Sequence, residues 1–160
     1  MQTRAIPMEE LTELIMLQLE NGGKARLTVT GVSMMPMLYN RRDTVNLIPV
    51  DGIQKVGEVI LYRRENGQYV LHRIIQVTEN GYICCGDNQA MREPVEHSQL
   101  LAVMESFTRK GKTYKRTDPG YRFYTWIWVN LFLFRKPYIA VRRFFSRIRR
   151  RLKNNQKKGK

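Results

Sequence analysis

The sequence has few of the residues that make covalent or metal-held cores. It contains two cysteines and two histidines in 160 residues. Cys84 and Cys85 are adjacent, and neighbouring cysteines rarely reach disulfide geometry without strain. So few ligands do not favour a structural zinc site. We therefore predict reduced thiols, no metal and no cofactor. Side-chain alternation in a strand predicts one cysteine facing inward and the other outward, and free thiols favour a reducing compartment.

Long apolar runs are also absent. No segment reaches the roughly 20 apolar residues that a helix needs to cross a bilayer. Residues 1–20 contain Arg4 and several glutamates, which interrupt the apolar core of a secretory signal sequence. We therefore expect neither a signal peptide nor an N-terminal membrane anchor.

Acidic residues are missing from the C-terminal quarter of the chain. Residues 1–120 hold 15 Lys/Arg and 14 Asp/Glu, whereas residues 121–160 hold 13 Lys/Arg and no acid. The net charge of +14 therefore lies almost entirely in a cationic tail. Such a tail predicts an anionic partner, either phospholipid or nucleic acid.

The tail is also rich in apolar and aromatic residues. Residues 123–134 are almost wholly apolar, and a helix beginning near Pro137 would carry an apolar stripe surrounded by arginines. This pattern is typical of a helix that lies in the plane of an anionic membrane surface. Trp126 and Trp128 either anchor the tail at the interface or pack on the folded body. Nucleic acid is the less favoured partner because the tail has no docking motif.

The rest of the chain predicts a mainly β protein. Residues 8–20 have the spacing of one amphipathic helix, which Asn21 and two glycines end. Turn signals at 66–67 and 80–81 predict two hairpins, and the absence of helices between strands favours an antiparallel, barrel-like sheet. We divide the chain into an N-terminal helix (1–23), a β-rich domain (24–118) and the tail (119–160). The predicted strands cover residues 25–30, 44–48, 58–63, 69–77, 81–85 and 100–107.

Three segments of the β-rich domain contain residues suited to catalysis. Ser33 follows a strand and lies between Gly31 and Pro36, in a turn that would expose its hydroxyl beside free backbone N–H groups. His72 lies within an apolar strand, where a partly buried imidazole can transfer protons near neutral pH. Asp87 and Glu93 follow the 81–85 strand, and either carboxylate could orient this imidazole. Taken alone, each segment is better explained as a simple turn, a core histidine or a capping acid.

Taken in order, these segments resemble the boxes of the signal peptidase I family of serine peptidases over residues 25–107. The histidine at the base position is similar to the endoplasmic-reticulum and archaeal branch of that family. Self-cleaving repressors of the SOS type share the fold but use lysine. The matching boxes are Ser33-Met34-Met35-Pro36-Met37-Leu38, Gly57-Glu58-Val59-Ile60, His72-Arg73-Ile74 and Gly86-Asp87-Asn88.

The resemblance implies a β-rich fold that cleaves extended peptides, often after small residues. It implies Ser33 as nucleophile, His72 as general base, and the Ser33 N–H as part of the oxyanion hole. Gly31 stands where many members carry a second oxyanion donor, so that donor stays open. The orienting acid also stays open, because Glu93 is the nearest match in position and Asp87 is the alternative.

The sequence leaves three classes of function to compare. The favoured one is a serine endopeptidase that cleaves leader-like or signal-like peptides near a membrane. The second is a catalytically silent β-rich binding module tethered by its tail, and the third is a nucleic-acid binder. Because basic tails favour the inner leaflet, we expect membrane association on the cytoplasmic face, with the extracytoplasmic face as the alternative.

Overall fold

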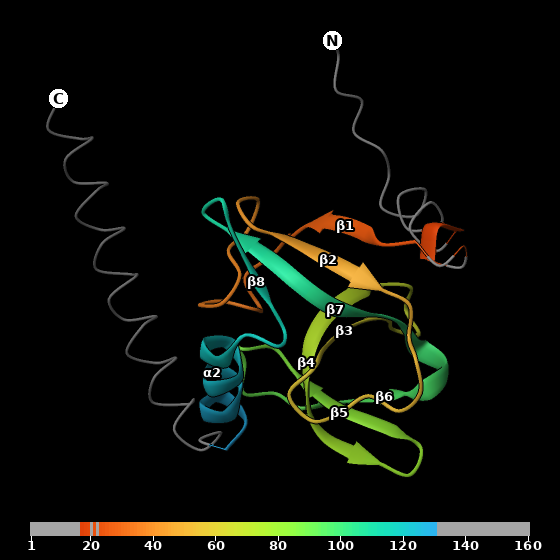
Figure 1. Cartoon of the computed structure of the whole chain (residues 1–160). Coiled ribbons are helices and arrows are strands. Elements are labelled where there is room, and N and C mark those ends of the chain that lie inside the picture. The colour runs from red at the N-terminus through yellow and green to blue at the C-terminus, as the bar shows by residue number, and fades with distance from the viewer. Residues whose placement is uncertain (1–16, 20, 22, 131–160) are drawn as a thin grey trace, which may run out of the picture.

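The computed structural model describes residues 17–19, 21 and 23–130, which form one curled sheet with a helix beside it (Figure 1). The elements are β1 (Ala25–Thr28), β2 (Thr44–Ile48), β3 (Val59–Arg63), β4 (Tyr69–Thr78), β5 (Gly81–Cys85), β6 (Glu93–Glu96), the short 3-10 helix η1 (His97–Gln99), β7 (Leu100–Arg109), β8 (Lys112–Lys115) and α2 (Pro119–Asn130).

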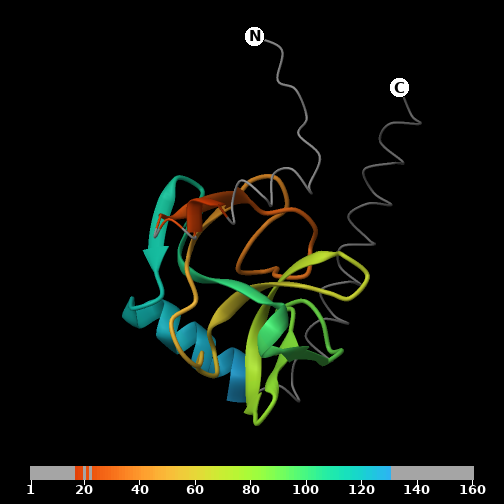
Figure 2. The same cartoon turned by 90° about the vertical axis from the view of Figure 1, so that its right-hand side faces the viewer.

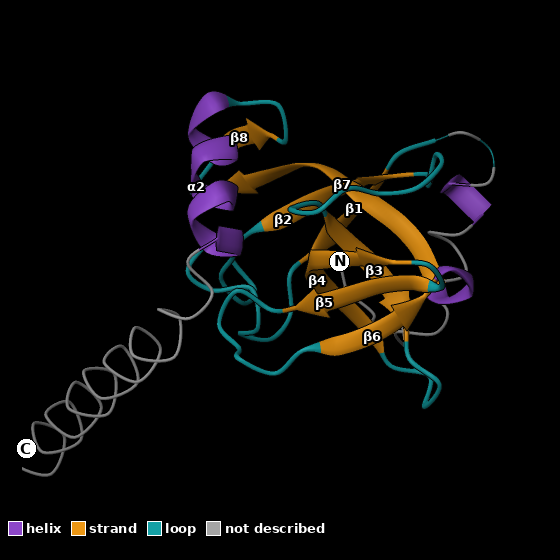
Figure 3. Cartoon of the chain, turned by 90° about the horizontal axis from the view of Figure 1, so that it is seen from below, coloured by secondary structure: helices purple, strands orange, loops and turns teal. Residues whose placement is uncertain are grey.

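The strands pair in the order β1-β2-β7-β3-β4-β5-β6, and β8 pairs with β7. Every pairing is antiparallel. The β3–β4 and β4–β5 hairpins turn at the predicted positions. Seen from below, the strands curl around a common interior (Figure 3). The prediction of a mainly antiparallel β protein is confirmed.

The curl follows from interruptions in the strand register and from two groups of buried side chains. The register shifts twice along β7, against β2 and β3, and once along β4, against β5. Such bulges bend and twist a strand. One buried group joins β1, β2 and β7 to the turn after β1, with Leu38 and Leu47 fully buried. The other joins β3, β4 and β5 around Tyr62 and Ile74.

Two strands were not predicted, and each has a local reason. β6 contains Pro94, which removes a backbone donor, but β6 lies at the edge of the sheet, where a strand tolerates proline. β8 is short, and two of its four residues are lysines. It forms a hairpin with β7 through Lys110 and Gly111, both of which have positive φ, as a tight hairpin turn requires.

The helix α2 begins at Pro119, in the predicted C-terminal segment. Figures 1 and 2 show it beside the ends of β4 and β5. The remainder of the predicted tail, residues 131–160, lies outside the described residues, as does nearly all of the predicted helix over residues 8–20. No helix in the described part of the chain is long and apolar enough to cross a membrane.

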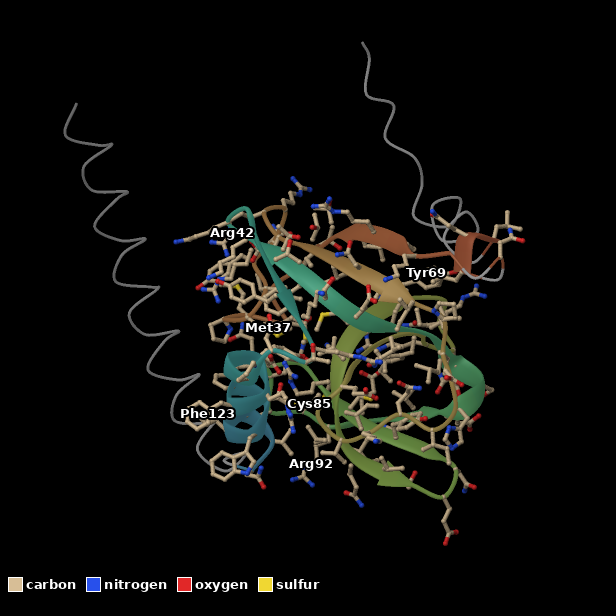
Figure 4. The ribbon with its side chains drawn as sticks, viewed as in Figure 1. Met37, Arg42, Tyr69, Cys85, Arg92 and Phe123 are labelled. Atoms are coloured by element: carbon tan, nitrogen blue, oxygen red, sulfur yellow. The ribbon has the colours of Figure 1, made fainter. Side chains whose placement is uncertain are left out.

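The two cysteines correct one prediction. Both are reduced thiols and both are buried, whereas alternation predicted that one would face outward. The sheet is covered on both faces at this point. The Sγ of Cys85 lies 3.4 Å from the carbonyl oxygens of Gly86 and Gln89, in the loop after β5. Figure 4 shows Cys85 on the side of α2 that faces the sheet.

Candidate active site

Ser33 lies in the turn that follows β1. Side chains on one side of this turn pack into the core and hold it in place. Met34 and Leu38 are buried in the core, while Val32 is exposed and Ser33 is half-buried. Gly31 has a φ of 83°, a conformation that L side chains rarely adopt, so glycine is favoured there on backbone grounds. Its N–H donates to Oδ1 of Asn40.

The loop after β5 holds the backbone of this turn. The Asn88 N–H donates to the carbonyl oxygen of Ser33 at 2.6 Å, and its Nδ2 donates to the carbonyl oxygen of Val32 at 3.1 Å. These two carbonyls therefore point toward the loop. The Ser33 N–H makes no hydrogen bond to any described residue, so it is available to a ligand.

His72 comes close to the same loop from β4. A Cβ built on Gly86 would lie 2.8 Å from the carbonyl oxygen of Ser33 and 3.0 Å from Nε2 of His72. The serine backbone and the imidazole Nε2 therefore flank one point, and any side chain at position 86 would wedge between them. Ser33 and His72 also line the same cavity, together with Gln89, the residues that follow β1 and the β3–β4 hairpin.

The other nitrogen of His72 faces a polar chain. Nδ1 lies 3.1 Å from the hydroxyl oxygen of Tyr62 on β3, and that hydroxyl lies 2.8 Å from Oε2 of Glu93 on β6. Oε2 itself is 3.8 Å from Nδ1. Arg64 completes the chain by donating from Nε and Nη2 to the two oxygens of the Glu93 carboxylate.

The direction of these hydrogen bonds fixes the tautomer of His72. The guanidinium of Arg64 lowers the pKa of Glu93, so Glu93 is a carboxylate that only accepts. The Tyr62 hydroxyl must therefore donate its one proton to Glu93. Its oxygen is left to accept from Nδ1–H of His72. This places the lone pair of the neutral imidazole on Nε2, on the side of the cavity and Gly86.

Burial keeps this imidazole uncharged. His72 is 2% exposed, and loss of solvent lowers its pKa to about 4. The charge of Glu93 opposes that shift. His72 is therefore neutral throughout the physiological range, which is the form that can accept a proton.

Asp87, the second predicted acid, has a different position. It is fully buried and accepts hydrogen bonds from Nε and Nη2 of Arg73 at 2.9 and 2.8 Å. The structure records no hydrogen bond between Asp87 and His72. Of the two candidate acids, Glu93 is the one joined to His72, and it is joined through Tyr62.

The structure therefore brings Ser33, His72 and Glu93 together and directs Asp87 to Arg73. Tyr62 and Arg64 belong to the site but were not among the predicted residues. The signal for Tyr62 is the strand register, which the structure supplies. In the β3–β4 hairpin Ile60 pairs with His72 and Tyr62 pairs with Val70, so Tyr62 lies on the same face as His72, two residues further along the hairpin.

We also looked for a metal site in the described residues and for similar proteins. Within residues 17–19, 21 and 23–130, no group of three or more His, Cys, Asp or Glu side chains could hold a metal ion. No protein-family profile, curated protein or solved structure matches the chain.

Proposed function

We propose that the protein is a serine endopeptidase in which Ser33 is the nucleophile and His72 the general base. The observation that carries this proposal is the neutral imidazole of His72. Its Nδ1 is held by Tyr62 and Glu93, and its Nε2 faces the loop that holds the Ser33 backbone. A serine hydroxyl needs such an adjacent, oriented base to become nucleophilic.

The reaction begins with attack of the Ser33 hydroxyl oxygen on a peptide carbonyl. Nε2 of His72 takes the hydroxyl proton and then gives it to the leaving amine. The imidazolium that forms between these steps is stabilised by the negative charge of Glu93, relayed through Tyr62. Water, deprotonated by the same nitrogen, releases the acyl group from Ser33. The free Ser33 N–H donates to the oxyanion.

The substrate in this proposal is an extended peptide or precursor segment. The cavity beside Ser33 and His72 has a volume of about 730 Å³ and is bounded by the turn after β1 and the β3–β4 hairpin. That volume suits several residues of a peptide. The resemblance of the sequence boxes to signal peptidase I favours a leader-like or signal-like segment.

The proposed enzyme associates with anionic membrane surfaces. On α2, Phe123 and Trp126 are 65% and 57% exposed, and their rings stack on each other. Figure 4 shows Phe123 on the side of α2 turned away from the sheet. Twelve Lys/Arg and no acid follow in residues 131–160. Exposed aromatics beside basic residues favour a lipid interface, on the cytoplasmic face or, as the alternative, the extracytoplasmic face.

Flotation of the full chain with vesicles tests this association. We expect binding to vesicles containing phosphatidylserine, weakened by salt and by Trp126→Ala, and little binding to neutral phosphatidylcholine vesicles. Equal flotation with both lipids, or none with either, would contradict the membrane partner. A salt-sensitive shift of RNA or DNA in place of flotation would favour nucleic acid.

Cleavage of a peptide library separates the peptidase from a silent binding module. The full chain is incubated with the library, and the products are read by mass spectrometry. We expect cuts by the wild type and by Ser98→Ala, which changes an exposed serine outside the site, and none by Ser33→Ala. Peptides that are retained but never cut would indicate the binding module instead.

A further inference from the structure

The helix α2 contacts the active-site segments through one of its faces. Tyr124 donates its hydroxyl proton to Oδ2 of Asp87 at 2.9 Å, and Trp128 donates Nε1–H to the backbone oxygen of Asp87 at 3.0 Å. The two rings stack with centroids 5.0 Å apart. This inner face is defined by Tyr121, Tyr124, Thr125 and Trp128.

The same face also reaches Arg73. Nη1 of Arg73 donates to the hydroxyl of Tyr121 at 3.0 Å and to Oγ1 of Thr125 at 3.1 Å. Nη2 lies 3.2 Å from Sδ of Met37, which belongs to the turn that carries Ser33. The fully buried guanidinium of Arg73 thus joins β4, α2 and the turn that carries Ser33.

The partners of α2 are immediate neighbours of the proposed catalytic machinery. Arg73 follows His72 along β4. Asp87 precedes Asn88, whose N–H donates to the carbonyl oxygen of Ser33. Displacement of Asp87 therefore shifts the group that holds the Ser33 backbone, while His72 stays fixed by Tyr62 on the opposite side.

We propose that the inner face of α2 is a positioning element for catalysis, and that Tyr124 and Trp128 are its positioning residues. They fix the loop of residues 86–88 and thereby set the separation of Ser33 and His72. This inference rests on the proposed peptidase function and adds to it the requirement that α2 be docked. Neither side chain touches the reacting atoms.

The contacts explain why these two residues affect position more than folding. Loss of the Tyr124 hydroxyl leaves both hydrogen bonds between Arg73 and Asp87 intact. Loss of the Trp128 N–H frees a backbone oxygen of the loop itself. The core is retained, but the loop gains freedom, and small misplacements of reacting groups have large effects on rate.

Kinetics of matched variants on one helix test the inference. Tyr124→Phe keeps the ring and removes the hydroxyl, and Trp128→Phe replaces the indole by a smaller ring that cannot donate. Asn130→Ala removes an exposed donor from the same helix and is the control. We expect the double variant Tyr124→Phe/Trp128→Phe to lower kcat by about tenfold or more with KM within about twofold of the wild type. Asn130→Ala leaves both constants unchanged.

Amide hydrogen exchange gives a readout that does not need activity. We expect the Asn88 amide to exchange faster in the double variant and at the wild-type rate in Asn130→Ala, while core amides of β4 stay protected. Unchanged exchange at Asn88 with unchanged kcat would overturn the inference, and so would uniform loss of protection across the sheet. If the wild type cleaves no peptide, the proposed function fails, and exchange at Asn88 alone decides whether α2 positions the loop.

Discussion

Two arginine–carboxylate pairs flank the candidate site, and they differ in burial. The Arg73–Asp87 pair has side chains that are 0% exposed on both sides. The Arg64–Glu93 pair has side chains that are 31% and 19% exposed. The first pair is enclosed by α2, Met37 and Gly57, and the second lies at the edge strand β6.

The two pairs differ in the hydrogen-bond partners of their carboxylates as well as in burial. Asp87 accepts two hydrogen bonds from Arg73 and one from Tyr124, and none joins it to His72. Glu93 is bound on one side by Arg64 and still accepts from Tyr62, which contacts His72. The buried pair therefore holds segments in place, whereas the edge pair acts on the imidazole.

The largest expected difference between the two pairs is in stability, when the carboxylate of each pair is removed. We expect Asp87→Ala to lower the free energy of unfolding by about 3–5 kcal/mol, because it leaves Arg73 charged and unpaired in the core. Glu93→Ala leaves a partly solvated guanidinium and should cost no more than about 1 kcal/mol. Urea unfolding of both variants makes the comparison, and equal losses would contradict the assignment.

Loss of the Glu93 charge should have its main effect on rate. We expect Glu93→Gln to lower kcat about 100-fold, because the imidazolium of His72 loses its counter-charge. Its unfolding free energy should change by less than about 1 kcal/mol. Steady-state kinetics against Glu96→Gln, an exposed acid on the same strand, supplies the control. Wild-type kcat in Glu93→Gln would remove Glu93 from the mechanism.

The pH dependence should follow the lowered pKa of His72. Because the pKa is about 4 in the folded protein and near 6.5 when unfolded, His72 is neutral in both states above pH 6.5 and contributes nothing there. As the pH falls toward 4, only the unfolded state binds the proton, so stability declines by about 3 kcal/mol in total.

The pH dependence of catalysis should also report the protonation of His72. We expect kcat/KM to be level from neutral pH to about 5 and to fall through an apparent pKa near 4. In Glu93→Gln that pKa should fall further, because the Glu93 charge raises it in the wild type. An acid limb near pH 6.5 would mean that His72 is solvated in the proposed enzyme, contrary to its burial.

Removal of Arg64, the arginine of the partly exposed pair, should have the smallest effect on catalysis and stability. The positive charge of Arg64 lowers the pKa of His72, so Arg64→Met should raise the apparent pKa of the acid limb. Stability should change by less than about 1 kcal/mol, since the pair is partly exposed. Arg26→Met, on β1, is the control and should leave the limb unmoved. A downward shift in Arg64→Met would contradict the chain from Arg64 to His72.

Much of the sheet could be predicted from local patterns, and the exceptions depend on neighbours. The hairpins at 66–67 and 80–81 follow from glycine turns between apolar strands. β6 could not be predicted, because Pro94 is tolerated only once the strand lies at an edge. The burial of Cys85 and Arg73 could not be predicted either. It requires a loop and α2 to cover what a local pattern treats as an open face.

The residues of the candidate site likewise include some that the sequence could predict and others that depend on neighbours. Ser33, His72 and Glu93 follow from the sequence boxes and their order. The choice between Glu93 and Asp87 needs the partner of each acid, and those partners, Tyr62 and Arg73, are fixed by strand register and by α2. The division of Trp128 and Trp126 between packing and exposure likewise depends on how α2 docks.

Covalent labelling of the serine tests the central claim most directly. The full chain is treated with a fluorophosphonate probe, and the adduct is located by tandem mass spectrometry. We predict a single adduct on Ser33, absent from Ser33→Ala, strongly slowed in His72→Ala and unaffected by His97→Gln. No adduct, an adduct on another residue, or an undiminished rate in His72→Ala would contradict a Ser33 nucleophile activated by His72.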